Sequence, residues 1–163
     1  MKPYLAKINA VQNADQLVAL LAEMEPEMGL GFFGSYIGAD AKNSNKNVIY
    51  VGTGSLGLPD RDYYVSDAPD NKEKREKYVA HVTKMLQYLG ESEATANANA
   101  KKILALETKM STATLDRVQR RDRRNTYNPM SFADLQKLAP TVKWDTYFQS
   151  VGIGKRSEEH TSE

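Results

Sequence analysis

The chain has 163 residues, a formal net charge of +1 and no cysteine, with 40% hydrophobic and 26% charged residues. This composition is typical of a soluble globular domain; it excludes a disordered chain and disulfide or thiolate chemistry, and it gives no overall attraction to nucleic acid or anionic membranes. No run approaches the roughly 18 apolar residues of a membrane span, and the N-terminus lacks the apolar segment of a secretory signal.

The first predicted elements are two helices and a hairpin. Apolar residues at helical spacing predict a helix at the N-terminus (Tyr4, Leu5, Ile8 and Val11), and a second helix starts at Asn13 and ends between Pro26 and Gly29. The runs Gly31–Asp40 and Lys46–Val51 are rich in aromatic and β-branched residues and flank a polar turn. They predict an antiparallel β-hairpin.

Two longer helices are predicted next. Asp70 and Glu73 are expected to cap the first, which Gly90 stops, and Ser92 to start the second. The short link between them predicts antiparallel neighbours. Their inward faces are expected to carry Tyr78, Val82, Met85, Leu86 and Leu89 on the first helix, and Ala96, Ala100, Ile103, Leu106 and Met110 on the second.

The last third of the chain is predicted to hold shorter elements. The run from Asp116 to Pro129 is expected to be an irregular basic loop. Ser131 with Asp134 then caps a short helix, and a last helix covers Trp144–Val151. The predicted fold class is therefore mainly α with one short antiparallel β-hairpin.

Three glycines after the second strand, Gly52, Gly54 and Gly57, match the spacing G-x-G-x-x-G. A dinucleotide site needs this turn to open a helix directly and an acidic residue about 20 positions later at the end of another strand. Pro59 obstructs such a helix, and a predicted helix occupies the place of the second strand. The glycines are therefore interpreted as a turn that leaves a strand.

A cluster of arginines could contact phosphates, but Asp116 and Asp122 dilute it and Tyr127 is the only nearby ring for stacking a base. The favoured interpretation is a solvated or ion-paired segment, with a small RNA-binding domain as an alternative. The cluster consists of Arg117, Arg120, Arg121, Arg123 and Arg124.

The sequence contains no recognisable pattern of metal ligands or catalytic residues. The chain has two histidines: His81 lies inside a predicted helix without a partner at ligand spacing, and His160 lies in the tail "RSEEHTSE", which lacks the H-E-x-x-H spacing. The tail, residues 156–163, resembles the in-frame translation of a sequencing-library adapter and is expected to be an artefact. No catalytic residue and no metal ligand are predicted in this chain.

Three stretches resemble the neprilysin family of zinc metallopeptidases, which includes endothelin-converting enzymes and bacterial PepO-type oligopeptidases. They are "YIGADAKNSNKNVIYVGTGSLGLPDRDYY", "RVQRRDRRNTYNPMSFADLQKLAP" and "VKWDTYFQSVGI", and the likeness runs from about Tyr4 to Ile153. The residues that carry it most specifically are Gly57, Leu58, Pro59, Arg61, Asp62, Tyr63, Tyr64, Tyr127 and Asn128. On this resemblance, the glycines let the chain turn off the hairpin, Tyr63 and Tyr64 bury their rings, and Arg61 and the aspartates satisfy local backbone and charge.

The resemblance also implies a role. Family members have two mainly helical lobes around a chamber, with zinc held in the C-terminal part by H-E-x-x-H and a further glutamate. Residues 1–155 are therefore expected to be a piece of the N-terminal, non-catalytic lobe, cut at both ends, which restricts access to the chamber. Zinc, oligopeptide substrates and a C-terminal catalytic domain are expected for the whole protein; the chain itself is expected to be inactive, to bind no zinc and no nucleic acid, and to contain no membrane span.

Two questions stay open at this level. A stand-alone helical module that binds peptides is the main alternative to a piece of a peptidase. The resemblance also leaves the compartment open: an extracytoplasmic parent, periplasmic or secreted, is the expectation, and a cytosolic one is the alternative.

Overall fold

The computed structural model describes residues 2–28 and 33–154, and the predicted artefact tail, with His160, lies outside them. The described residues form helices and one two-stranded antiparallel sheet, which confirms the predicted fold class. They divide into two compact units. The first unit takes the residues up to Ser55 and those from Asn128 onward, and the second is Leu56–Tyr127.

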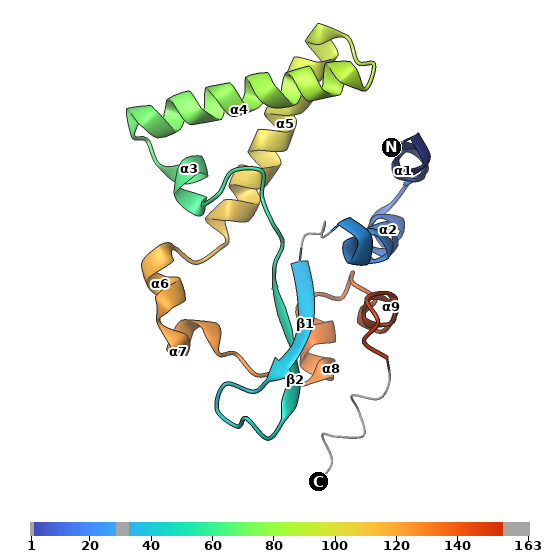
Figure 1. Cartoon of the computed structure of the whole chain (residues 1–163), viewed down its shortest axis with the longest axis vertical. Helices are drawn as coiled ribbons and strands as arrows, with labels where there is room; N and C mark the ends of the chain where they lie inside the picture. The colour runs from blue at the N-terminus through green and yellow to red at the C-terminus, as the bar shows by residue number, and fades with distance from the viewer. Residues whose placement is uncertain (1, 29–32, 155–163) are drawn as a thin grey trace. The chain divides into compact units, whose positions relative to one another are not determined.

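In the part of the first unit that the structure describes, helices accompany the hairpin (Figure 1). The elements described in it are α1 (Lys2–Asn9), α2 (Ala14–Met28), β1 (Phe33–Ala39), β2 (Asn47–Thr53), α8 (Phe132–Leu138) and α9 (Trp144–Ser150). The predicted hairpin is confirmed, with Tyr36 paired to Tyr50 near its centre. Ser131 caps α8 as predicted, since its hydroxyl accepts a hydrogen bond from the N–H of Asp134 at 3.2 Å.

The core of the first unit is aromatic and joins segments far apart in the sequence. Trp144, Tyr147 and Phe148 of α9 are buried, and Phe33 of β1 stacks edge-on against Tyr147 with ring centroids 4.7 Å apart. Ala22 of α2 is also buried there, so α2 and α9 pack together against the inner face of the hairpin. Such aromatic contacts combine a large buried area with specific ring geometry.

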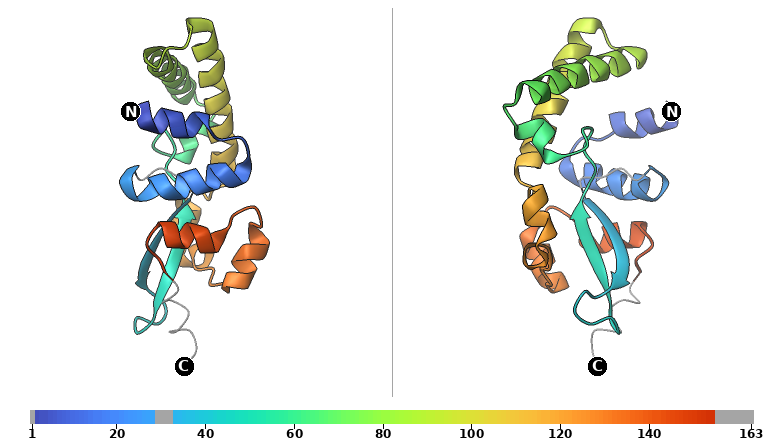
Figure 2. Two further views of the ribbon diagram at one scale, coloured as in Figure 1. Left: turned by 90° about the vertical axis from the view of Figure 1, so that its right-hand side faces the viewer. Right: turned by 60° about the vertical axis from the view of Figure 1, so that its left-hand side comes forward.

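The second unit is helical. Its elements are α3 (Arg61–Val65), α4 (Pro69–Tyr88), α5 (Glu93–Thr112), α6 (Arg117–Arg121) and α7 (Arg123–Thr126). Gly90 joins α4 to α5 with φ of +103°, a left-handed conformation that ends helices at glycine. Ser92 caps α5 as predicted, and the two long helices contact each other and run at an angle to one another (Figure 2).

Three sequence predictions for the second unit are wrong. The helix α4 begins at Pro69, whose fixed φ suits a first helical position, so Asp70 is not its cap. The expected basic loop contains α6 and α7, because Asp116 and Gln119 form a capping box and Asp122 caps the next turn.

The third concerns the inward faces of the long helices. Met85 and Leu89 of α4 are 42% and 47% exposed, and Leu106 of α5 is 50% exposed. Ala96 and Ala100 of α5 are buried as predicted, and Ser111, which was not predicted, is buried with them. Among the helices that the structure describes, none has both the length and the apolar character needed to cross a membrane.

Candidate functional site

The signature segment, Gly57–Tyr64, lies in the second unit. Residues 57–60 are a loop, and Arg61, Asp62, Tyr63 and Tyr64 make the first turn of α3. Tyr64 is buried at 3% exposure, Tyr63 is half-buried, and Asp62 and Pro59 are exposed. The segment therefore buries the side chain of Tyr64 and leaves that of Asp62 exposed to solvent.

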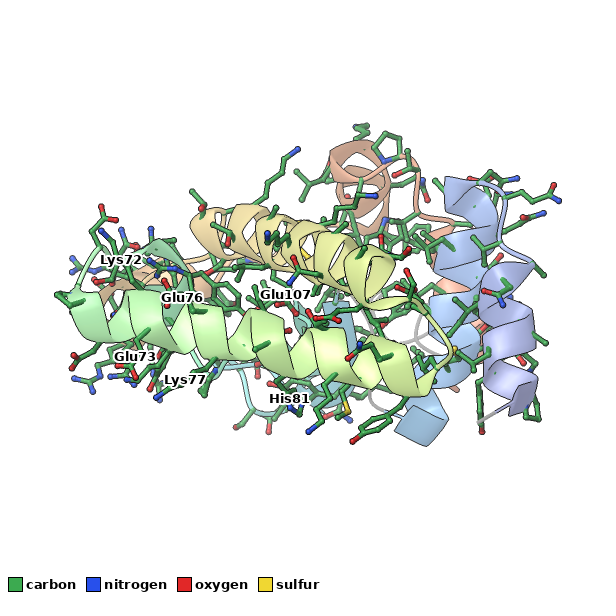
Figure 3. The ribbon with its side chains drawn as sticks, turned by 90° about the horizontal axis from the view of Figure 1, so that it is seen from above. Lys72, Glu73, Glu76, Lys77, His81 and Glu107 are labelled. Atoms are coloured by element: carbon green, nitrogen blue, oxygen red, sulfur yellow. The ribbon has the colours of Figure 1, made fainter. Side chains whose placement is uncertain are left out.

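The carboxylate of Glu107 on α5 accepts hydrogen bonds from two residues of the signature segment. Its Oε1 accepts a hydrogen bond from the N–H of Gly57 at 3.0 Å, and its Oε2 accepts one from the hydroxyl of Tyr64 at 3.1 Å. The Tyr64 hydroxyl in turn accepts from the N–H of Leu58 at 2.6 Å. Figure 3 shows Glu107 between α4 and α5. Since hydrogen bonds to a charged group are the stronger kind, this carboxylate fixes the path of the loop onto the helices.

Tyr78 of α4 completes this cluster, which we call the Glu107 cluster: Gly57, Leu58, Tyr64, Tyr78 and Glu107. Burial, together with the neighbouring Glu107 carboxylate, raises the pKa of the Tyr78 phenol. A Cβ atom on Gly57 would lie 2.0 Å from the Tyr78 hydroxyl, closer than any real contact. The glycine is therefore required by the close approach of this ring.

Burial also raises the pKa of Tyr64, to about 12, and the neighbouring Glu107 carboxylate raises it further, while the N–H of Leu58 acts in the opposite direction. Both phenols therefore stay protonated at neutral pH and act as hydrogen-bond donors. A proton donor or acceptor for catalysis near pH 7 needs a pKa near that value, so these groups hold structure rather than move protons.

An arginine closes the end of α3. The Nη1 of Arg75 donates to the carbonyl oxygens of Tyr63 at 2.8 Å and Ser66 at 2.9 Å. These carbonyls lie at the helix C-terminus, where cationic side chains satisfy unpaired acceptors. Lys74 lies over the Tyr63 ring, 4.8 Å from its centroid.

The arginine cluster is partly ion-paired. Asp60, whose side chain is only 10% exposed, accepts from Arg117 Nε at 2.5 Å and from Arg120 Nη2 at 3.3 Å. The hydrogen bond from Arg117 is the main cause that lowers the pKa of Asp60, although burial opposes it. Arg124 pairs with Asp122 at 2.7 Å. These pairs fasten α6 to the loop that precedes α3.

The remaining two signature residues lie elsewhere in the chain. Tyr127 follows α7 and donates its N–H to the carbonyl of Arg123 at 2.9 Å. Asn128 is exposed and opens the second stretch of the first unit. The structure thus joins Gly57, Leu58 and Tyr64 in one cluster, while Tyr127 and Asn128 belong to the chain around the end of α7.

The described residues do not fit a zinc site. Zinc needs at least three ligands from histidine, cysteine or carboxylate, and no such group occurs among residues 2–28 and 33–154. His81 lies exposed on α4, on the side that also carries Glu73 and Lys77 (Figure 3). Glu73 is engaged there by Lys77 at 2.6 Å.

The first unit contains a small cavity. It measures about 20 Å³ and lies between α2 and the start of α9, beside the ion pair of Asp15 with Lys143 at 3.1 Å. This volume holds about one water molecule, too little for a substrate or cofactor.

The key residues that the sequence did not reveal are Glu107, Tyr78 and Arg75. Glu107 is half-buried on α5, whereas a lone glutamate in a helix ordinarily indicates a solvated position. A usable signal was Gly57, six residues before the pair Tyr63–Tyr64, because a glycine often marks a place where another side chain approaches the backbone closely.

Comparisons with known proteins match most of the chain to one region of larger proteins. A family model described as peptidase family M13, for its N-terminal part, matches residues 1–162. The chain is 36% identical over 121 residues to endothelin-converting enzyme 1 of Cavia porcellus, which covers 74% of this chain and 16% of that protein. It is 34% identical over 126 residues to neprilysin-3 of Drosophila melanogaster, covering 76% of this chain and 16% of that protein.

A solved structure agrees with these matches. The zinc metalloprotease Zmp1 of Mycobacterium tuberculosis, determined by cryo-electron microscopy in an open state, superimposes with a TM-score of 0.85 at 29% identity. The match covers 93% of this chain and 23% of that one. The chain therefore spans 16% of the length of these curated relatives and about a quarter of this solved structure.

Proposed function

The chain belongs to peptidase family M13, as its resemblance to the neprilysin family predicted, and we propose that it is part of the non-catalytic lobe of a zinc metalloendopeptidase that cleaves oligopeptides. In this proposal the lobe restricts access to the catalytic chamber, so that short peptides enter and folded proteins do not. The zinc ligands and the catalytic base belong to the rest of the whole protein.

One observation carries this proposal. Nearly the whole chain, 93%, superimposes on less than a quarter of a zinc metalloprotease, at a TM-score of 0.85. A domain that reuses the fold alone need not keep the sequence, but here 29% identity accompanies the superposition. The match to the N-terminal family model points to the same region.

The Glu107 cluster supports a structural rather than a chemical role for the signature residues. Its carboxylate accepts hydrogen bonds from the N–H of Gly57 and the hydroxyl of Tyr64, and it raises the pKa of the neighbouring Tyr78. A lobe that excludes large substrates must hold its shape, and such a network is rigid when all its members are satisfied. We therefore assign Gly57, Leu58 and Tyr64 to shape-keeping, and not to substrate chemistry.

Two further parts of the proposal concern the chain as given. Residues 1–155 form the lobe segment, and residues 156–163 contribute nothing to it. The chain alone binds no zinc in a defined site and cleaves no peptide, because zinc hydrolysis needs three protein ligands, an open position for water and a nearby base.

The test compares the chain with the whole protein obtained by extending the gene. Both are assayed with an internally quenched peptide, with and without a chelator. We expect chelator-sensitive cleavage by the whole protein and none by the chain, and loss of cleavage of a folded protein substrate relative to its denatured form. A downstream gene without H-E-x-x-H, or a whole protein that cleaves folded and denatured substrates equally, would contradict the proposal.

A further inference from the structure

The two edges of the hairpin differ in how their main-chain groups are satisfied. In an antiparallel pair, residues alternate between positions that hydrogen-bond to the partner strand and positions whose N–H and C=O point away from it. The N–H of Asp40 donates to the carbonyl of Lys46 at 2.8 Å, which fixes this alternation along the register. The outward-pointing residues are therefore Phe33, Ser35, Ile37 and Ala39 on β1, and Asn47, Ile49, Val51 and Thr53 on β2.

Side chains cap the outer edge of β1. The N–H of Ser35 donates to Oε1 of Glu25 at 3.2 Å, and the same carboxylate accepts from the Tyr147 hydroxyl at 2.5 Å. The Tyr50 ring crosses over Gly38 and donates its hydroxyl to the carbonyl of Ala39 at 2.8 Å. Such side-chain caps blunt an edge strand and block the addition of a further strand.

Among the described residues, no side chain caps the outer edge of β2 in this way. Within the part of the chain that the structure describes, the outward N–H and C=O groups of Ile49, Val51 and Thr53 have no hydrogen-bond partner. Val51 is 39% exposed, and a Cβ on the adjacent Gly52 would meet nothing within 4 Å. The edge is therefore open along the half of β2 that is nearest the signature segment in sequence.

We propose that the free edge of β2 binds an extended peptide segment as a third strand of the hairpin. The occupant follows from the chemistry of the edge: its donors and acceptors repeat every second residue, and an extended peptide backbone presents the same repeat. The apolar side chains of Ile49, Tyr50 and Val51 lie on both faces beside it, so the peptide carries β-branched or aromatic residues at alternate positions.

The choice of an oligopeptide rests on the proposed function, which brings such chains to this lobe. Binding at β2 then brings an unstructured peptide to the lobe. It selects against folded proteins, because their strands are already paired. The site requires no metal and no catalytic residue. Its test therefore uses binding by the chain alone and stays separate from the activity test above.

The experiment measures fluorescence anisotropy with a fluorescein-labelled peptide of alternating threonine and valine, as long as the 7 residues of β2. Val51→Pro removes one outward N–H without removing a ladder bond, since proline is tolerated where the N–H faces away from the partner strand. We expect binding weakened at least about fivefold, as for loss of one main-chain hydrogen bond in a small interface. The matched control is Ile37→Pro, which removes the equivalent outward N–H on β1, between the capped positions Ser35 and Ala39, and should leave binding unchanged.

A second measurement keeps the proposal testable if a proline disturbs the hairpin. The peptide is N-methylated at every second residue, in the two alternate registers, and titrated into the unaltered chain. A strand that pairs by one edge loses binding in one register only. Equal effects of both registers, absence of saturable binding by the chain, or a signal explained by edge-to-edge pairing of two copies that rises with chain concentration would each overturn the proposal.

Discussion

The two units are held together in different ways. The core of the first unit is built from aromatic rings of α9 and β1, and the contact of Phe33 with Trp144 joins residues on opposite sides of the whole second unit in the sequence. The second unit buries mainly small residues, Ala96, Ala100 and Ser111, between its helices, and fills the remaining space with the hydrogen-bonded Glu107 cluster.

This difference determines what each unit tolerates. Aromatic packing stabilises through buried area, so the loss of a ring leaves a cavity that the surroundings fill incompletely. A buried polar cluster stabilises only while each member keeps its partner, and removal of one partner leaves the others unsatisfied. The first unit should therefore be sensitive to volume, and the second to charge and hydrogen bonding.

The largest expected effect is loss of the ring at the centre of the first unit. Trp144 is 3% exposed, and Trp144→Ala should lower the free energy of unfolding by about 3–5 kcal/mol. Hydrogen exchange followed by mass spectrometry should show faster exchange in α2 and α9, with α4 and α5 still protected. The measurement of stability is urea denaturation followed by circular dichroism.

Two variants sharpen this test. Leu138→Ala removes an apolar side chain that is 71% exposed and should change stability by less than about 0.5 kcal/mol. Trp144→Phe should cost less than Trp144→Ala, because the buried Nε1 of Trp144 has no hydrogen-bond partner among the described residues and its removal carries no loss. Equal exchange in both units of Trp144→Ala would show that they unfold together.

The second effect tests the polar cluster. Glu107→Gln keeps the shape of the side chain but removes the charge and replaces one acceptor with a donor that faces existing donors. We expect a loss of about 2 kcal/mol, the scale of a hydrogen-bonded charged group. Faster exchange should appear at the N–H groups of Gly57 and Leu58, which the cluster protects.

The matched control is Glu76→Gln on the exposed surface of α4, which should leave both stability and exchange unchanged. If Glu107→Gln behaves in the same way, the cluster is not what holds the signature segment, and the contrast between the two units fails.

The local elements and the Glu107 cluster differ in how far they could be predicted from the sequence. The hairpin, the cap at Ser92 and the stop at Gly90 follow from local rules of turn and cap chemistry, and the structure confirms them. The Glu107 cluster could not be predicted, because it joins Gly57 to a residue 50 positions later, and helical periodicity treats a glutamate as solvated. The helix α6 was missed because its arginines dominate the composition, although the capping box of Asp116 with Gln119 was visible in the sequence.

A third effect appears at alkaline pH and is shared by both units. The pKa of Tyr64 and that of Tyr147 are each raised from 10.0 to about 12, chiefly by burial. Since the folded-state pKa lies above the unfolded one, the stabilisation is complete below pH 10 and is lost as pH rises through 12. At pH 11 the loss should be about 1 kcal/mol for each tyrosine.

The measurement is urea denaturation at pH 8 and pH 11, together with absorbance of tyrosinate at 295 nm. Tyr64→Phe and Tyr147→Phe should each reduce the pH dependence by a similar amount, whereas Tyr88→Phe, at a position 73% exposed, should not change it. A variant of one unit that removed the whole pH dependence would assign the effect to that unit alone.

The smallest expected effect concerns the ion pairs on α6, and it separates exposed charge from the half-buried charge of Glu107. Arg117 lies 2.5 Å from Asp60 but is 66% exposed, so water and salt screen the pair. Arg117→Gln should therefore destabilise the chain less than Glu107→Gln at low salt, and less still in 1 M sodium chloride. The arginine lowers the pKa of Asp60, so this contribution is present above the ordinary pKa of aspartate, 3.8, and disappears as pH falls through the lower folded value.

Arg121→Gln is the control, since Arg121 makes no ion pair among the described residues. A loss for Arg117→Gln as large as that for Glu107→Gln, and equally insensitive to salt, would mean that the loop before α3 is held by Asp60 as strongly as by the Glu107 cluster, and that burial does not decide which charge matters in the second unit.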